Sequence, residues 1–147
     1  MKIQKPSLLL ILAFAGSGLL AQSAQKTLVK SFNVDSVSQV NITVDGPVEV
    51  KSWKQKTVRV VMEISLFNRP ESFLKGMISA GRYNLLSFTK SDVMTIIQPG
   101  VKKEVRLKDG QLQESFRYLV YAPEHIYVQV ESEASSSTLP LDENLPQ

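Results

Sequence analysis

His125 is the only histidine in the sequence and the side chain best suited to proton transfer near neutral pH. A catalytic triad or an acid–base pair would also need clustered carboxylates on converging loops, and no such cluster is present. A zinc site needs several His, Cys or carboxylate ligands, whereas the chain offers one imidazole and no thiol. The sequence contains no aspartate-rich calcium loop and no glycine-rich phosphate loop. We therefore expect no catalytic residue, no cofactor and no metal ligand, with His125 facing solvent in a turn after Pro123.

Four apolar or aromatic side chains are the candidate contacts for a ligand or partner: Trp53, Leu119, Tyr121 and Tyr127. Trp53 precedes the polar cluster 54–56 (Lys-Gln-Lys), and an aromatic edge beside cations can bind sugars or anionic surfaces. Trp at a strand exit more often seals the rim of a core. Leu119, Tyr121 and Tyr127 alternate with core-type residues, so their face must meet either a helix or a partner, and we favour the helix.

The first 23 residues have the layout of a cleavable signal peptide. Lys2 and Lys5 form a positive region ahead of an apolar run at residues 8–20, with cleavage expected after Ser23 or Ala21. A membrane-spanning helix needs about 20 apolar residues, so we expect release without a stable membrane anchor. The protein is predicted to be exported to the periplasm, the cell surface or the extracellular space.

The charge balance and the absence of cysteine restrict the remaining possibilities. The chain has no cysteine, so packing rather than disulfides must stabilise it. Loss of Lys2 and Lys5 with the signal leaves 15 of the 17 basic residues against 14 acidic ones. A nucleic-acid partner would call for a clustered basic face, and we predict none.

Apolar residues recur at every second position through most of residues 24–131, which predicts a single β-rich domain. Residues 40–44 and 48–50 alternate on either side of an Asp-Gly-Pro turn, which predicts a hairpin. Residues 58–66 give the clearest strand, with one buried face. Further strands are expected at 83–88, 93–97, 101–107, 112–121 and 126–130, the last two as a hairpin.

One segment has helical spacing instead. Pro70 and Glu71 open a stretch with apolar residues at 73, 74, 77 and 78, and Gly81 closes it, so a short helix lying on the sheet is predicted. The fold class is therefore mainly β with one short α-helix. Residues 132–147 are polar and rich in serine, and we expect a disordered tail.

Three stretches of the sequence carry a resemblance to a known family: residues 32–50, the segment WKQKTVRVV at 53–61 and RYLVYAPEHIYVQV at 117–130. They resemble the putative adhesin (DUF4097) family of exported bacterial proteins, which is common in Bacteroidetes, and residues 81–85 are also typical of it. The resemblance implies the N-terminal β unit of a solenoid-like, β-helix-like or sandwich-like domain at the envelope or cell surface. This chain departs from the family because the polar tail stands where repeated strands would follow, so it resembles a short version without those repeats.

Two functions follow from these observations. The favoured one is a non-enzymatic, adhesin-like envelope or cell-surface module that binds a protein or surface component through a sheet face or edge, with self-association possible through the open last strand at 126–130. The alternative is a periplasmic small-molecule carrier with a pocket between helix and sheet, made adaptable by Met62, Met77 and Met94.

Overall fold

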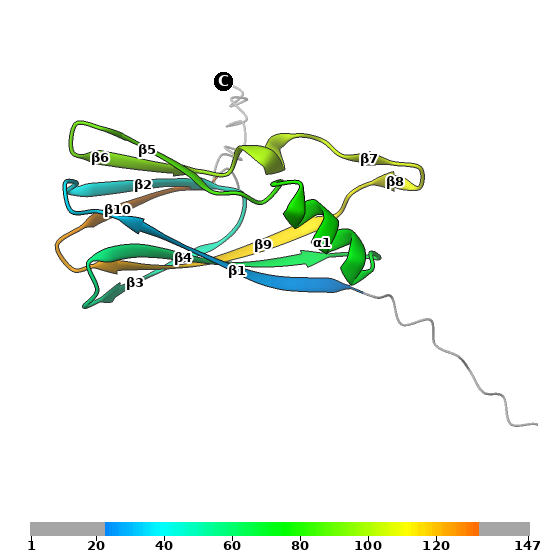
Figure 1. Ribbon diagram of the computed structural model, residues 1–147, viewed down its shortest axis with the longest axis horizontal. Coiled ribbons are helices and arrows are strands. Elements are labelled where there is room, and N and C mark those ends of the chain that lie inside the picture. Colours follow the sequence, from blue (N-terminus) through cyan, green and yellow to red (C-terminus); the bar gives the residue numbers. More distant parts are fainter. Residues whose placement is uncertain (1–22, 133–147) are drawn as a thin grey trace, which may run out of the picture.

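The computed structural model describes residues 23–132, which fold into two facing β-sheets and one short helix (Figure 1). The prediction of a mainly β domain with a single short α-helix is confirmed. The signal peptide predicted at residues 1–23 and the tail predicted at 132–147 lie almost wholly outside the described residues. Between residues 23 and 132, no helix has the length and apolar character needed to cross a membrane.

Each sheet has four strands and mixes parallel with antiparallel pairing. Sheet A has the order β1 (Ala24–Asn33), β4 (Thr57–Leu66), β9 (Glu114–Pro123) and β3 (Val48–Trp53). Its β3·β9 pair is parallel and its other two pairs are antiparallel. Sheet B has the order β10 (Tyr127–Ser132), β2 (Gln39–Val44), β6 (Val93–Ile97) and β5 (Leu86–Lys90). In sheet B only the β5·β6 pair is antiparallel.

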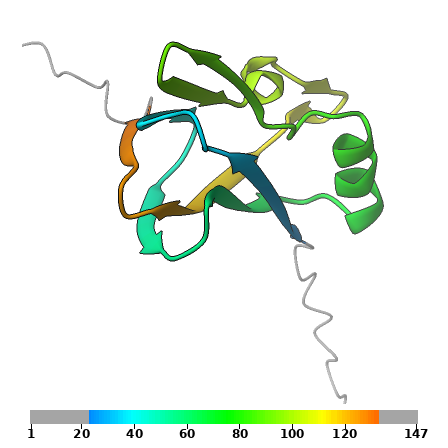
Figure 2. The same ribbon diagram turned by 60° about the vertical axis from the view of Figure 1, so that its left-hand side comes forward.

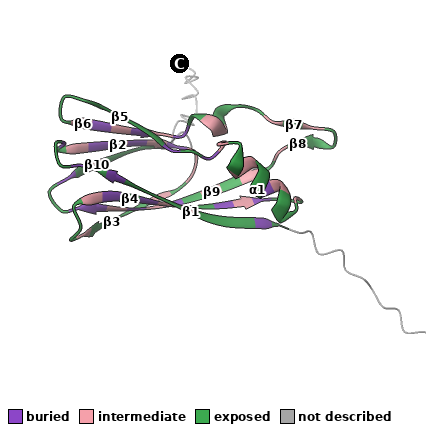
Figure 3. Ribbon diagram, in the orientation of Figure 1, coloured by how far each residue is buried: buried purple, intermediate pink, exposed green. Residues whose placement is uncertain are grey.

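The core lies between the sheets because alternate side chains of the central strands point inward. Buried residues accordingly alternate with more exposed ones along these strands (Figure 3). Burial of each large aliphatic side chain contributes about 1.5–3 kcal/mol, so this layer is the main source of stability. The inward-facing residues of four strands share one cluster, which confirms the alternation predicted for residues 58–66: Val40, Ile42, Val58, Val60, Met62, Ile64, Ile96, Tyr118 and Val120.

Both predicted hairpins are wrong, because the strands on either side of each turn lie in different sheets. β2 belongs to sheet B and β3 to sheet A, and the chain crosses between them at residues 45–47. β9 and β10 are separated in the same way. Alternation shows which residues face the core. The apolar pattern is the same whether the next strand pairs with the previous one in the same sheet or enters the opposite sheet.

The helix α1 (Glu71–Ser79) confirms the helical prediction, with Pro70 before its first turn and Gly81 after its end at a φ of +79°. Leu74 is fully buried in the common core, and the helix packs beside β1. Figure 2 places α1 at the opposite end of the molecule from β3 and β10. The expectation that it covers the outer face of β9 and β10 is therefore wrong.

The loops between α1 and β9 differ from their predicted strands. Tyr83 and Leu85 are buried in the turn before β5 rather than in a strand that begins at 83. A 3₁₀ helix, η1 (Pro99–Lys102), replaces the start of the strand predicted at 101–107. The short pair β7 (Arg106–Leu107) and β8 (Gly110–Gln111) encloses the predicted Asp-Gly turn.

Replacement of Gly46 by alanine should destabilise the protein by about 2 kcal/mol or more. A Cβ at position 46 would lie 2.7 Å from the backbone oxygen of Phe116, and the residue has a φ of +150°. Urea unfolding followed by circular dichroism measures the change. As the control, Gly76→Ala on the open face of α1 meets no atom within 4 Å, and should stabilise by about 0.5–1 kcal/mol. Equal effects of the two substitutions would contradict the crowding at Gly46.

Candidate functional site

Three of the four predicted contact residues lie on the outer face of sheet A. Leu119 and Tyr121 on β9 point away from the core, since their neighbours Tyr118 and Val120 are fully buried. Trp53 ends β3 and is paired in register with Pro123. Tyr127 is 65% exposed, but it lies on the outer face of sheet B, so the structure does not bring it together with the other three.

Trp53 is held in place by contacts on several sides. Its indole nitrogen donates a hydrogen bond to the carbonyl of Thr57 at 2.8 Å, and its ring centroid lies 5.3 Å from that of Tyr121. The guanidinium carbon of Arg59 lies 4.8 Å from the indole centroid, within range of a cation–π interaction. We call Trp53, Tyr121, Arg59 and Leu119 the aromatic patch. It is a partly exposed surface, and Trp53 is not among the buried core residues.

An apolar row continues the aromatic patch across sheet A. The register places Val29 of β1 beside Val61 of β4, and Val61 beside Leu119 of β9. Val29 is 60% exposed. Sequence reasoning missed Val29, Val61 and Arg59 as surface contacts, although Arg59 and Val61 have the parity opposite to the buried valines of β4. Val29 was missed because Lys26 and Lys30 occupy inward-facing positions of β1 and interrupt its apolar alternation.

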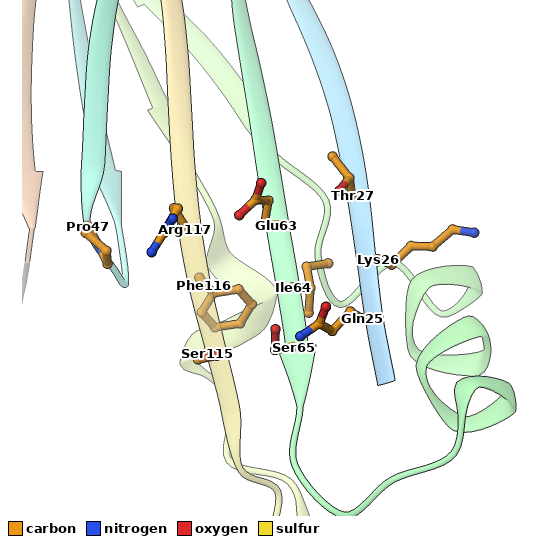
Figure 4. Close-up of a pocket in the computed structure, with 10 residues that line it drawn as sticks. All are labelled: Gln25, Lys26, Thr27, Pro47, Glu63, Ile64, Ser65, Ser115, Phe116 and Arg117. Carbon is orange, nitrogen blue, oxygen red and sulfur yellow. The ribbon is translucent and has the colours of Figure 1, made fainter. Parts of the chain in front are cut away.

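A shallow groove of about 550 Å³ lies beyond this row on sheet A (Figure 4). Its polar lining includes Gln25, Glu63, Ser65, Ser115 and Arg117, contributed by β1, β4 and β9. These groups can donate and accept hydrogen bonds along a strand-like or chain-like ligand. Along β4 and β9, the outer face of sheet A thus changes from polar at the groove to apolar at Val61 and Leu119 and then to aromatic at Tyr121.

The cleft between the helix and the sheet that Met62 lines is smaller than a usual ligand pocket, so it gives little support to the predicted small-molecule carrier. A cleft of about 240 Å³ lies between α1 and β1, lined in part by Met62 and Ile78. Ligand pockets usually measure about 300–1,000 Å³. Met77 and Met94 do not line this cleft, and Met94 is buried on β6. The three methionines therefore do not gather around one adaptable pocket.

The densest group of titratable side chains ties loops to strand β9. Arg82 contacts the Glu114 carboxylate through two nitrogens, at 2.8 and 2.5 Å, and donates to the carbonyls of Gly100 and Lys103, both at 2.9 Å. The Tyr83 hydroxyl donates to the same carboxylate at 2.7 Å. Burial, and then the bond to Glu114, raises the pKa of Tyr83 above its usual value. The hydrogen bond to Glu114 likewise raises the pKa of Arg82.

A second polar group lies inside the core. The buried Gln98 amide donates to the Met62 thioether at 2.9 Å and to the Tyr83 carbonyl at 3.3 Å, and it accepts from the Tyr118 hydroxyl. Burial raises the pKa of Tyr118. Within each of these two clusters, the polar side chains bond to one another or to nearby backbone carbonyls. Their hydrogen bonds therefore hold the loops and the core in place.

His125 is exposed in the turn between β9 and β10, as predicted. Within residues 23–132, no group of three or more His, Cys, Asp or Glu side chains is arranged to hold a metal ion. In the described residues, exposed large apolar side chains also lie on sheet B, at Leu86, Phe88 and Tyr127.

No family model matches the sequence, and no curated protein matches it. Among solved structures, a putative cell adhesion protein from Clostridium sporogenes is similar over 72% of this chain and 45% of its own, at 12% identity and a TM-score of 0.41. A putative adhesin from Parabacteroides merdae is similar over 73% and 35%, at 13% identity and a TM-score of 0.29. This chain spans less than half the length of either protein, and the similarity in structure is distant.

Replacement of Glu114 by glutamine should lower the free energy of unfolding by about 2 kcal/mol or more, because the nearly buried Arg82 charge loses its partner. Urea denaturation measures this change. Lys75→Gln breaks the exposed ion pair with Glu71 on α1, and it should leave the unfolding midpoint unchanged. A Glu114→Gln protein as stable as the Lys75→Gln control would show that the Arg82–Glu114 contact contributes nothing.

Replacement of Arg59 by methionine should loosen Trp53, because methionine keeps the apolar stem but removes the cation over the ring. Stability should fall by about 0.5–1 kcal/mol, and acrylamide should quench the fluorescence of this single tryptophan more strongly. Arg117→Met, on the same face but outside the aromatic patch, is the control. Unchanged quenching in Arg59→Met would mean that Arg59 does not hold the ring.

Proposed function

We propose that this protein is a non-enzymatic, exported module of the envelope or cell surface that binds a partner through the outer face of sheet A. The observation that carries the proposal is the partly exposed run from Val29 through Val61 and Leu119 to Trp53 and Tyr121, in which Val29 is exposed and the other four are half-buried. An apolar and aromatic surface rimmed by polar groups is typical of a protein interaction site.

The internal polar groups support binding rather than catalysis. The side chains of Arg82 and Tyr83 hold their loop to Glu114 of β9. The Gln98 amide bonds to the Tyr83 carbonyl inside the core. The polar atoms of these side chains are therefore used in structural contacts. A catalytic acid or base must reach a substrate in a cleft. These groups are held by one another, whereas the exposed face offers contact area.

A protein partner fits the aromatic patch better than a stacked sugar does. The Arg59 guanidinium already lies over the indole of Trp53, and the Tyr121 ring lies beside it. Less of the ring face is then open for a sugar to stack on. Rigid aromatic side chains lose little conformational freedom on binding, which suits a protein contact surface. The polar groove beyond the row can supply hydrogen bonds at the rim of the same interface.

Export rests on the sequence. Residues 1–23 have the charged, apolar and small-residue regions of a signal peptide. An exported domain without cysteine relies on its packed core for stability, which the filled space between the sheets provides.

A photo-crosslinking amino acid placed at position 119 tests the proposal in the native envelope. We expect Leu119, at the centre of the face, to yield a discrete crosslinked product that mass spectrometry identifies as one envelope protein. The control is the same crosslinker at Thr95, which lies on the outer face of sheet B. Equal products at both positions, or none at position 119, would contradict binding through sheet A.

A further inference from the structure

β3 is an unfinished edge of the sandwich. It ends the strand order of sheet A, and no strand within residues 23–132 pairs with its outer side. Val50 points inward like its register partner Val120, yet Val50 is 43% exposed whereas Val120 is fully buried. A strand added to this edge would complete the cover over Val50 and would satisfy the open backbone groups.

The open backbone groups can be assigned to particular residues. The Pro47 carbonyl accepts a hydrogen bond from the Tyr118 amide at 2.9 Å, so position 47 directs its backbone toward β9. Consecutive residues of a strand direct their amides to opposite sides. The amide and carbonyl groups of Val48, Val50 and Ser52 therefore point to the open side, where a new strand would bind.

The sequence of β3 is complementary to itself in one antiparallel register. If Val50 is placed opposite Val50 of a second copy, Val48 lies opposite Ser52, and the open backbone groups of all three residues can pair. On the outer face, Glu49 then lies opposite Lys51 of the other copy, twice by symmetry. Within one chain these two side chains already attract each other at 3.4 Å while remaining exposed.

The neighbouring registers that preserve the faces of the sheet are disfavoured by charge. Centring the pair on position 49 places Glu49 opposite Glu49, and centring it on position 51 places Lys51 opposite Lys51. Like charges directly opposite are destabilising, and opposite charges contribute roughly 0.2–1 kcal/mol. A register slip by one residue on one strand would turn the valine toward the wrong face. The charge pattern thus selects the register centred on Val50.

We propose that two copies of this protein associate through β3, in an antiparallel two-fold pair centred on Val50. The pairing joins sheet A of both copies into one continuous sheet and brings the two exposed Val50 side chains together. Such an interface is isologous, with the same surface used by both copies. It is independent of the proposed partner site, because the outer face of sheet A stays open on both copies.

The second sheet is placed to take part in the same contact. β10, the edge strand of sheet B, lies beside β3 at the same end of the molecule (Figure 2). Its inward-facing Val130 is 37% exposed, as expected for a core layer that is open at this end. If the two-fold axis is perpendicular to both sheets, β10 faces β10 of the second copy when β3 pairs with β3 of that copy. The valines of both edges are then covered together.

Charge reversal tests the register. The full chain should show a monomer–dimer equilibrium by sedimentation at concentrations on the order of 0.1 mM. Glu49→Lys and Lys51→Glu should each weaken dimerisation at least tenfold, because each places like charges opposite. An equimolar mixture of the two variants restores opposite charges at both positions and should form a heterodimer. Dimerisation unaffected by either variant, or a mixture that stays monomeric, would overturn the proposed register.

A single cysteine tests the contact at its centre. The chain has no native cysteine, and opposed residues of an antiparallel pair lie within disulfide range, at about 4.5–5.5 Å between Cα atoms. Oxidised Val50→Cys should form a disulfide-linked dimer, whereas the control Val29→Cys, on the opposite edge strand, should not. A Val50→Cys chain that stays monomeric and reacts freely with a thiol reagent would rule out the dimer. A monomer in which the introduced thiol is protected would also overturn it, since another segment of the same chain would then cover the edge.

Discussion

The close approach of Gly46 to the backbone of β9 fixes the relation between the two sheets. The chain leaves β2 in sheet B, passes against the carbonyl of Phe116 where a Cβ would clash, and enters sheet A as β3. The hydrogen bond from the Tyr118 amide to the Pro47 carbonyl then begins the parallel β3·β9 ladder. Because this crossing sets the register of β3, it also decides that Glu49, Lys51 and Trp53 face outward and that Val50 faces the core.

The inward-facing positions could be predicted from the sequence, but the partners of the strands could not. Residues 58–66 and 40–44 alternate, and the structure buries the apolar residues at every second position. A period of two says nothing about which sheet receives the next strand, so both hairpin predictions failed at turns that cross the core. β1 extends from Ala24, yet Lys26 and Lys30 hold inward positions beside the helix and the 84–85 loop, where Lys30 donates to the Leu85 carbonyl at 2.6 Å. That local exception concealed the first strand.

The candidate site was predictable to a similar degree. Alternation places Leu119 and Tyr121 off the core face, whereas it favours Trp53 as a residue that seals the rim of the core; the structure brings these three onto one surface. Tyr127 has the same alternation but belongs to the other sheet, so periodicity placed it wrongly with them. Arg59 becomes part of the patch only through the β4·β9 register, which aligns it with Tyr121 from a distant part of the sequence. Contacts of this kind depend on tertiary pairing, and local patterns do not encode them.

The position of β2 has a consequence for how the chain acquires its structure during synthesis. β2 is a central strand of sheet B, and one of its two partner strands is β10. These two strands lie far apart in the sequence: the hydrogen bond between Gln39 and Gln129 joins residues separated by 90 positions. Closing so long a loop before the strands can pair makes folding slow. Sheet B cannot be completed until the last strand has been made. Until β10 has been made, one side of β2 has no partner strand, and its backbone groups remain open to any other strand that could pair with them.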